Sequence, residues 1–144
     1  MKAEELMIGD LVTFKDCQND EAKTIIKIWG LNSDGDAFAF IDGFDTLDEI
    51  NIDDEIVGIP LTPEILEKNG FKKGRYCYEF KERLVGYMGQ TVSATTPIEI
   101  NYYEEGHCVV MNPHIGRDFQ GSISYVHELQ HALRLCGIEK EIVI

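Results

Sequence analysis

One stretch of sequence, IPLTPEILEKNGF at residues 59–71, divides the chain into two parts with different patterns. Thr62 is a good helix N-cap, and Pro63 suits the first helical position because an N–H there would have no intrahelical partner. Gly70 favours a left-handed helix end, after which Phe71 can fold back onto the apolar side of the helix. The stretch therefore predicts a short helix that joins two modules.

The N-terminal module, residues 1–61, alternates short apolar runs with Gly, Asp and Asn turns. The predicted strands cover residues 11–14, 23–31, 37–41, 50–52 and 56–59. Several short strands at close spacing are typical of a small barrel or a curled sheet. We expect an SH3-like small β-barrel.

The C-terminal module, residues 62–144, begins with the joining helix and continues with alternating aromatic and polar residues. Period-2 alternation is the pattern of half-buried strands. The predicted elements are strands at residues 75–81, 84–88, 98–102 and 107–111, a helix from Ser124 to Cys136, and a terminal strand at residues 141–144. We expect an antiparallel sheet packed with one helix, so the fold class of the whole chain is α+β.

The charge of the chain is strongly acidic and uneven. Its 144 residues carry a net charge of −13, and residues 1–61 carry 15 acids against four lysines, a net of −11. Between Asp42 and Glu55 there are seven acids and no base. Nucleic-acid phosphates are bound by Lys and Arg, so the N-terminal module is not expected to bind DNA or RNA. An acidic surface of this kind suits a basic protein partner.

Other features of the composition indicate a cytoplasmic protein. No apolar run approaches the roughly 18 residues that span a bilayer, and the charged start of the chain does not resemble a signal peptide. The four cysteines are scattered singly and are expected to be free thiols in a reducing compartment: Cys17, Cys77, Cys108 and Cys136.

One enzyme-like motif stands in the final predicted helix, His127-Glu128-Leu129-Gln130-His131. In zinc metallopeptidases this H-E-x-x-H spacing places two imidazoles on one helix face, where both bind zinc, and the Glu acts as general base. With the His and Glu content of this chain the motif arises by chance about once in a hundred sequences. A zinc site therefore has to be weighed against a structural helix.

The helical period favours the structural interpretation. The apolar residues of the helix cluster opposite the midpoint of His127 and His131, which predicts that both imidazoles point outward to water. A catalytic zinc also needs a third protein ligand. The candidates are Glu139 and Glu141 downstream and His107, Cys108 and His114 upstream, and no rule places any of them beside the motif. We expect no metal and no cofactor.

Three segments resemble a family of short uncharacterised proteins encoded in Bacteroides-type genomes, often in prophages or other mobile elements. They are residues 1–10, with Met1-Lys2-Ala3-Glu4-Glu5-Leu6 and Gly9-Asp10, residues 59–71, and residues 125–133. The resemblance implies no known activity. It also implies that Gln often replaces Glu128 and that His131 is not always His, which suits a helix kept for structural reasons.

The expected function is that of a non-enzymatic accessory protein of a phage or mobile element, acting by binding an unknown protein. Two alternatives remain. One is a small zinc-dependent metallohydrolase, with His127 and His131 as metal ligands and Glu128 as the catalytic residue. The other is a nucleic-acid-associated barrel module.

Overall fold

The computed structural model describes residues 5–17, 24–32, 34, 36–75, 77–80, 98–102, 108–111, 120–135 and 138–144. The chain forms two compact units. The first contains Met1–Pro60 together with Tyr125–His131, and the second contains Leu61–Ser124 together with Ala132–Ile144. The sequence predicts Tyr125–His131 in the C-terminal module, but the structure places this segment, which holds the H-E-x-x-H motif, with the N-terminal unit.

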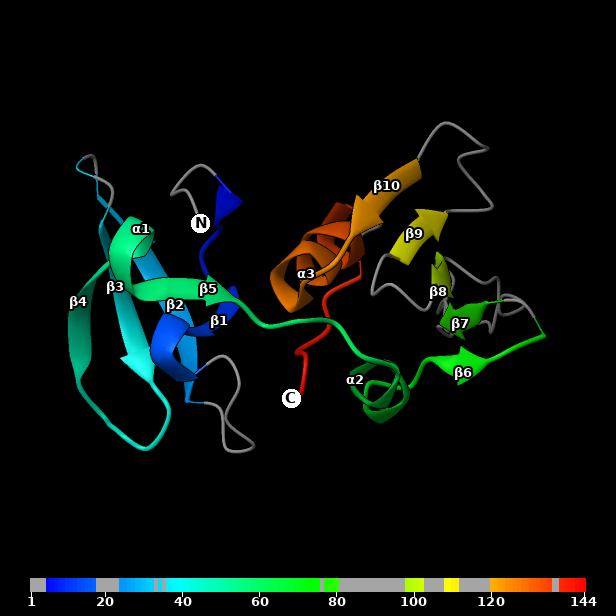
Figure 1. Ribbon diagram of the computed structural model, residues 1–144, viewed down its shortest axis with the longest axis horizontal. Helices are drawn as coiled ribbons and strands as arrows, with labels where there is room; N and C mark the ends of the chain where they lie inside the picture. The colour runs from blue at the N-terminus through cyan, green and yellow to red at the C-terminus, as the bar shows by residue number, and fades with distance from the viewer. Residues whose placement is uncertain are drawn as a thin grey trace, which may run out of the picture. The chain divides into compact units, whose positions relative to one another are not determined.

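The N-terminal unit is built on one antiparallel sheet with the strand order β4-β3-β2-β1-β5 (Figure 1). Its elements are β1 (Leu11–Phe14), the 3-10 turn η2 (Lys15–Cys17), β2 (Ile25–Leu31), β3 (Asp36–Ile41), β4 (Leu47–Asn51), α1 (Ile52–Glu55) and β5 (Ile56–Gly58). The predicted strands are present, except that the alternation through Ile52 ends at Asn51, whose side chain caps the short helix α1. Among the described residues β4 and β5 are the two edges, so no closed barrel is formed by these pairings.

Alternation along the strands gives this sheet one buried face. In β2, Ile26 and Ile28 are buried while Lys27 and Trp29 are exposed, and β3 repeats the pattern with two buried alanines. The core is made of Leu6, Val12, Ile26, Ile28, Ala37, Ala39, Ile50, Ile52 and Ile56. Burial of these aliphatic side chains is the main force that holds the sheet together.

The C-terminal unit contains a second antiparallel sheet with the order β10-β9-β8-β7-β6. Its elements are α2 (Pro63–Lys68), β6 (Lys72–Lys73), β7 (Tyr78–Phe80), β8 (Ile98–Tyr102), β9 (Cys108–Met111) and β10 (Gln120–Ile123), followed by α3 (Val126–Leu135). The sequence did not predict β6 and β10, and the strand predicted at residues 84–88 lies outside the described residues. The α+β class is confirmed.

The joining helix α2 has the ends that the sequence predicts. The Thr62 hydroxyl accepts a hydrogen bond from the N–H of Ile65 at 3.4 Å, and Pro63 is the first helical residue. Gly70 has a φ of +83°, and the following residue, Phe71, is 2% exposed. Because a residue with a Cβ is strained at such a φ, glycine suits this helix end.

The strand predicted at residues 141–144 is absent, because this segment forms no sheet pairing. Asn69 takes the place of a neighbouring strand. Its side-chain NH₂ donates to the carbonyl of Val143 at 2.7 Å, and its side-chain oxygen accepts from the N–H of the same residue at 2.9 Å. Ile142 is buried at 3% exposure, and Lys68 Nζ donates to the carbonyl of Ile144, so side chains hold the segment in place of a sheet ladder.

Two further predictions concern the membrane and the cysteines. Among the described residues there is no helix with the length and apolar character needed to cross a bilayer. Cys17 and Cys77 are free thiols, as predicted. Cys136 and the side chain of Cys108 lie outside the described residues.

A candidate binding pocket at the start of helix α3

The start of α3 is fixed by backbone contacts with the strand end at residues 58–60. Pro60 and Tyr125 form an isolated antiparallel bridge, and the N–H of Val126 donates to the carbonyl of Ile59 at 2.9 Å. The Glu128 carboxylate accepts from the N–H of Tyr125 at 3.0 Å. A third helical residue that binds the N–H of the cap residue in this way is one half of a capping box. Glu128 therefore holds the first turn of the helix.

Gln130 ties the same helix to the start of β1. Its side-chain oxygen accepts from the N–H of Leu11 at 2.9 Å, and its NH₂ group donates to the carbonyl of Gly9 at 3.0 Å. The residue is only 7% exposed. Both ends of one buried amide are thus satisfied by backbone groups that lie about 120 positions away in the chain.

The imidazole of His131 is held by the buried carboxylate of Asp10. Its Nε2 lies 2.7 Å from Oδ2 of Asp10, whose side chain is fully buried, while the imidazole is 24% exposed. The same carboxylate oxygen accepts from the N–H of Met7 at 2.7 Å. A carboxylate that contacts one imidazole nitrogen fixes both the orientation of the ring and its tautomer.

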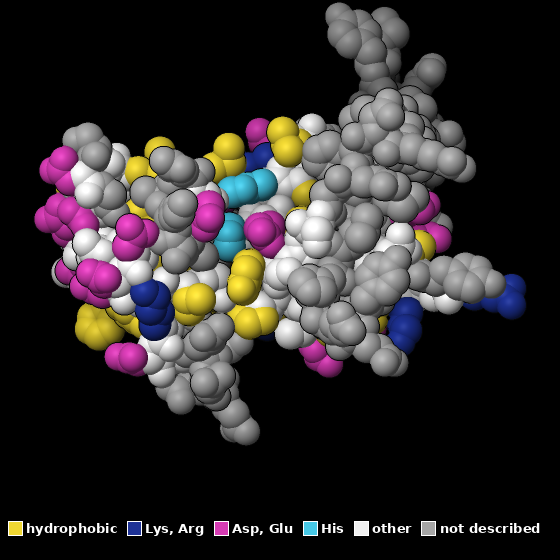
Figure 2. Space-filling model, turned by 45° about the horizontal axis from the view of Figure 1, so that its top comes forward, with side chains coloured by type: hydrophobic (Ala, Val, Ile, Leu, Met, Phe, Trp, Pro, Cys, Tyr) yellow, Lys and Arg dark blue, Asp and Glu magenta, His cyan; other side chains and the backbone are white. Residues whose placement is uncertain are grey.

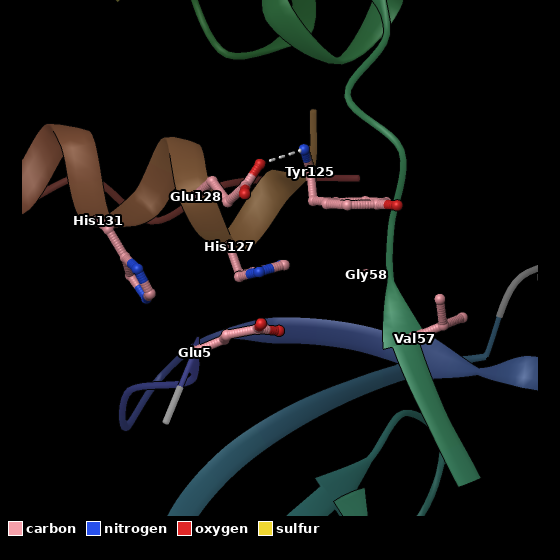
Figure 3. A pocket seen from close by; sticks show the side chains of 7 residues that line it. All are labelled: Glu5, Val57, Gly58, Tyr125, His127, Glu128 and His131. Atoms are coloured by element: carbon pink, nitrogen blue, oxygen red, sulfur yellow. Dashed lines mark hydrogen bonds between the residues drawn. The ribbon is translucent and has the colours of Figure 1, made fainter. Parts of the chain in front are cut away.

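These contacts form one wall of a pocket of about 530 Å³ inside the N-terminal unit. The residues that line it are Glu5, Val57, Gly58, Tyr125, His127, Glu128 and His131 (Figure 3). Figure 3 shows the two imidazoles reaching from the helix toward the segment that carries Glu5. In Figure 2 the imidazoles lie beside acidic side chains.

The orientation of the histidines corrects a prediction of the sequence. We expected both imidazoles to point outward to water, but His127 is 3% exposed and His131 is hydrogen-bonded to Asp10. The apolar side of the helix is confirmed, since Val126, Leu129, Ala132 and Leu133 are all buried. The helix is buried around more of its circumference than its hydrophobic pattern indicates.

Close packing against a glycine sets the shape of the wall. The rings of Tyr125 and His127 are stacked, with centroids 5.7 Å apart and planes inclined by 14°. A Cβ on Gly58 would lie 2.6 Å from Cγ and Cδ1 of Tyr125 and 3.0 Å from Cε1 of His127. No carbon atom fits at such distances, so the flat aromatic wall requires glycine at this position of β5.

The environment of His127 favours the neutral form of its imidazole. Burial lowers the pKa of His127 below its ordinary value of 6.5, because the charged form loses solvation. The acids Asp10, Glu128 and Glu5 act in the opposite direction, and His131 adds to the lowering. Nδ1 of His127 is buried and has no hydrogen-bond partner. A buried polar atom of this kind is uncommon in folded proteins.

The pocket brings together all three residues of the predicted motif, but in different roles from those of a zinc hydrolase. The Glu128 carboxylate holds a backbone N–H, and the Nε2 atom of His131 faces Asp10. In the described part of the chain no three or more His, Cys, Asp and Glu residues are grouped so that they could hold a metal ion. The lining residues that the structure describes include no Ser, Thr or Cys as a nucleophile.

Of the other predicted ligands, the two that the structure describes do not line the pocket. Glu139 and Glu141 are not among the lining residues and belong to the C-terminal unit. His107, His114 and the side chain of Cys108 lie outside the described residues.

Several residues that shape the site are not predicted by the sequence. Asp10 looked like a turn residue, and Glu5, Tyr125 and Gly58 carried no local signal. The helical period places Gln130 beside the two histidines, opposite the apolar residues of the helix. Each of them matters only because distant segments meet at this pocket.

Comparison with protein-family models, with curated proteins and with solved structures found no match. The interpretation of the site therefore depends on its own residues, and the resemblance to the Bacteroides-type family stays a prediction.

Proposed function

We propose that this protein is a non-enzymatic accessory protein that binds another protein through the outer face of strands β2, β3 and β4. The observation that supports this function is a set of large apolar side chains left exposed on that face. We call this surface the aromatic face and define it by Trp29, Phe38, Phe40 and Leu47.

The strand register brings these side chains together. Phe40 is paired with Leu47 across β3 and β4, and the ring of Trp29 contacts the ring of Phe40 edge-on, with centroids 5.7 Å apart. Phe38 packs over Gly30, where a Cβ would lie 3.8 Å from its ring. The four side chains therefore form one continuous surface.

The four side chains of the aromatic face are exposed to water over a large part of their surface. Trp29 is 60% exposed, Leu47 45%, and Phe38 and Phe40 37% each. With about 200 Å² for each full side chain, these fractions correspond to roughly 350 Å² of apolar surface, a size at which patches on monomers are often functional. Binding a partner would remove this area from water.

The charge around the aromatic face indicates the chemistry of the partner. All seven acids between Asp42 and Glu55 are exposed, and Figure 2 shows acidic side chains gathered on the same unit. Glu49 lies on the face itself, opposite Phe38 on β3, and Lys27 on β2 lies opposite Phe40. Charge complementarity favours a basic partner segment with apolar side chains. The same acids oppose nucleic-acid phosphates, although aromatic side chains can stack on bases.

The topology is compatible with the SH3-like barrel that the sequence predicts. Four consecutive strands form a meander, α1 provides a single helical turn, and β5 returns to pair with β1. A role in a phage or mobile element is part of the proposal and is supported by the resemblance of residues 1–10, 59–71 and 125–133.

The single tryptophan of the chain provides the test, because Trp29 lies on the proposed surface. The probe is a tryptophan-free peptide of alternating Lys and Leu, and the control is the same peptide with Glu in place of Lys. We expect the Lys peptide to shift the Trp29 emission to shorter wavelength with saturation, and the Glu peptide to have no effect. Binding should weaken as salt is added.

A matched pair of variants locates the binding surface. Phe40→Ser should lower the affinity for the Lys peptide at least tenfold. Leu135→Ser, which removes a 69% exposed apolar side chain of α3, should leave this affinity unchanged. Circular dichroism verifies that both variants are folded, and Leu47→Ser on the edge strand replaces Phe40→Ser if that variant is not. Three results would overturn the proposal. They are equal affinity for the Lys and Glu peptides, the same loss of affinity in the aromatic-face variant and in Leu135→Ser, or tighter binding of a 20-nucleotide oligo-dT than of the Lys peptide.

A further inference from the structure

Strand β4 forms one edge of the N-terminal sheet, next to the aromatic face. It pairs with β3 on one side, and none of the described residues pairs with its other side (Figure 1). An edge of this kind presents backbone N–H and C=O groups that can pair with another strand. The direction of each backbone group along β4 follows from the register of β3.

The hydrogen bonds at the two ends of β3 show which of its residues turn toward β2. The carbonyl of Asp36 accepts from the N–H of Asn32 at 3.0 Å. The N–H of Asp42, just after β3, donates to the carbonyl of Ile25 at 2.8 Å. Backbone groups alternate in direction along a strand, so the even-numbered residues of β3 bond toward β2 and the odd-numbered residues bond toward β4.

This alternation gives Leu47 and Glu49 an outward direction on β4. The two alanines of β3 bond toward β4, where they stand opposite Asp48 and Ile50. The N–H and C=O groups of Leu47 and Glu49 therefore point away from the sheet. Their side chains lie on the aromatic face, because both residues stand opposite its phenylalanines.

The side chains of β4 indicate what kind of strand can pair with it. Asp48 and Glu49 are both exposed, and the Glu49 carboxylate accepts from the neutral amide of Asn32 at 3.4 Å, a contact that leaves its charge in place. A second copy of β4 would bring acids close to the same acids, and like charges across two strands destabilise a sheet. A strand with basic side chains is attracted instead, and apolar side chains beside Leu47 would extend the aromatic face.

We propose that the partner binds as an extended segment of alternating apolar and basic residues that adds an antiparallel strand to β4. Its apolar side chains lie on the aromatic face beside Leu47, and its basic side chains lie on the other side of the strand, beside Asp48. Its backbone bonds the outward N–H and C=O groups of Leu47 and Glu49, as in other cases of strand addition. This inference rests on the proposed function, because it describes how the same surface holds its partner.

Amide hydrogen exchange, followed by NMR on the full chain, tests the backbone pairing. In the free protein the N–H groups of Leu47 and Glu49 should exchange faster than those of Asp48 and Ile50, which bond to β3. We expect the peptide of alternating Lys and Leu to slow exchange at Leu47 and Glu49 at least tenfold. A partner that contacts only the side chains of the aromatic face would leave these two rates unchanged.

Two backbone-methylated forms of the Lys peptide are a matched pair of probes. In antiparallel pairing, the residues with side chains on the aromatic face are those with N–H groups that point to β4. N-methylation of every Leu removes these donors, whereas N-methylation of every Lys removes donors that point to water. The first form should therefore bind at least tenfold more weakly than the second, measured by the Trp29 emission.

The results distinguish a failure of this inference from a failure of the proposed function. If the Lys peptide produces no saturable shift of the Trp29 emission, both are wrong. If the Lys peptide binds, but the two methylated forms bind equally or in the reverse order, or exchange at Leu47 and Glu49 is not slowed, only the added strand is wrong. A dimer that protects the same two amides without peptide would also overturn it, since a second copy would then occupy the edge.

Discussion

Adding a single methyl group at Gly58 should disrupt the wall of the pocket. The new Cβ would lie 2.6 Å from two ring atoms of Tyr125 and 3.0 Å from His127, so one or both rings must move by about 1 Å to reach ordinary contact. Forcing an extra carbon into packed surroundings costs about 1–3 kcal/mol. For a chain of 144 residues this corresponds to a Tm lower by roughly 3–10 °C.

Gly30→Ala is the matched control for Gly58→Ala. Both glycines lie in strands of the same sheet, but a Cβ on Gly30 meets the Phe38 ring at 3.8 Å, an ordinary contact. Because alanine reduces the freedom of the unfolded chain, Gly30→Ala should be as stable as the parent or more stable by up to about 1 kcal/mol.

Thermal unfolding followed by circular dichroism measures both variants. The near-ultraviolet spectrum of Gly58→Ala should also change, since the Tyr125 ring is displaced from its stack. If Gly58→Ala melts at the temperature of Gly30→Ala, the rings of Tyr125 and His127 do not pack against β5 as the structure shows.

Two further predictions concern the helix contacts. The pKa of His127 is lowered by burial in the folded state, so the unfolded chain binds more protons below pH 6.5. The free energy of unfolding should therefore fall as the pH falls below 6.5. Chemical denaturation at pH 7 and pH 5 should show a smaller loss of this free energy in His127→Gln than in the parent. Gln130→Ala leaves the N–H of Leu11 and the carbonyl of Gly9 without their side-chain partner. This should lower the free energy of unfolding, measured by urea titration, by about 1–3 kcal/mol. An unchanged urea midpoint would contradict the two hydrogen bonds of Gln130.

The parts of the fold that the sequence predicts are those whose partners lie nearby in the chain. The cap of α2 needs only Thr62 and the N–H of Ile65, three positions apart, and its end needs only Gly70. Strand alternation in β2 and β3 depends on neighbouring residues in the same way. The missing terminal strand differs, because Val143 is held by Asn69 over 74 positions.

The candidate site was predicted only as a list of residues. His127, Glu128 and His131 were recognised from their spacing, and the structure does bring them to one pocket. Their roles were not predictable, because the groups that define those roles are distant. Asp10 is 121 positions from His131, and no local pattern connects the two.

The predicted orientation of the helix is wrong because a distant segment of the chain packs against its polar side. Hydrophobic periodicity ranks side chains by the free energy of leaving water, so it assigns His127 and Gln130 to the solvent. That assignment fails when another segment supplies hydrogen-bond partners, because a satisfied polar group can be buried at little net cost. Gln130 is satisfied in this way at both ends. Nδ1 of His127 is not, and a buried unpaired polar atom costs about 1–3 kcal/mol.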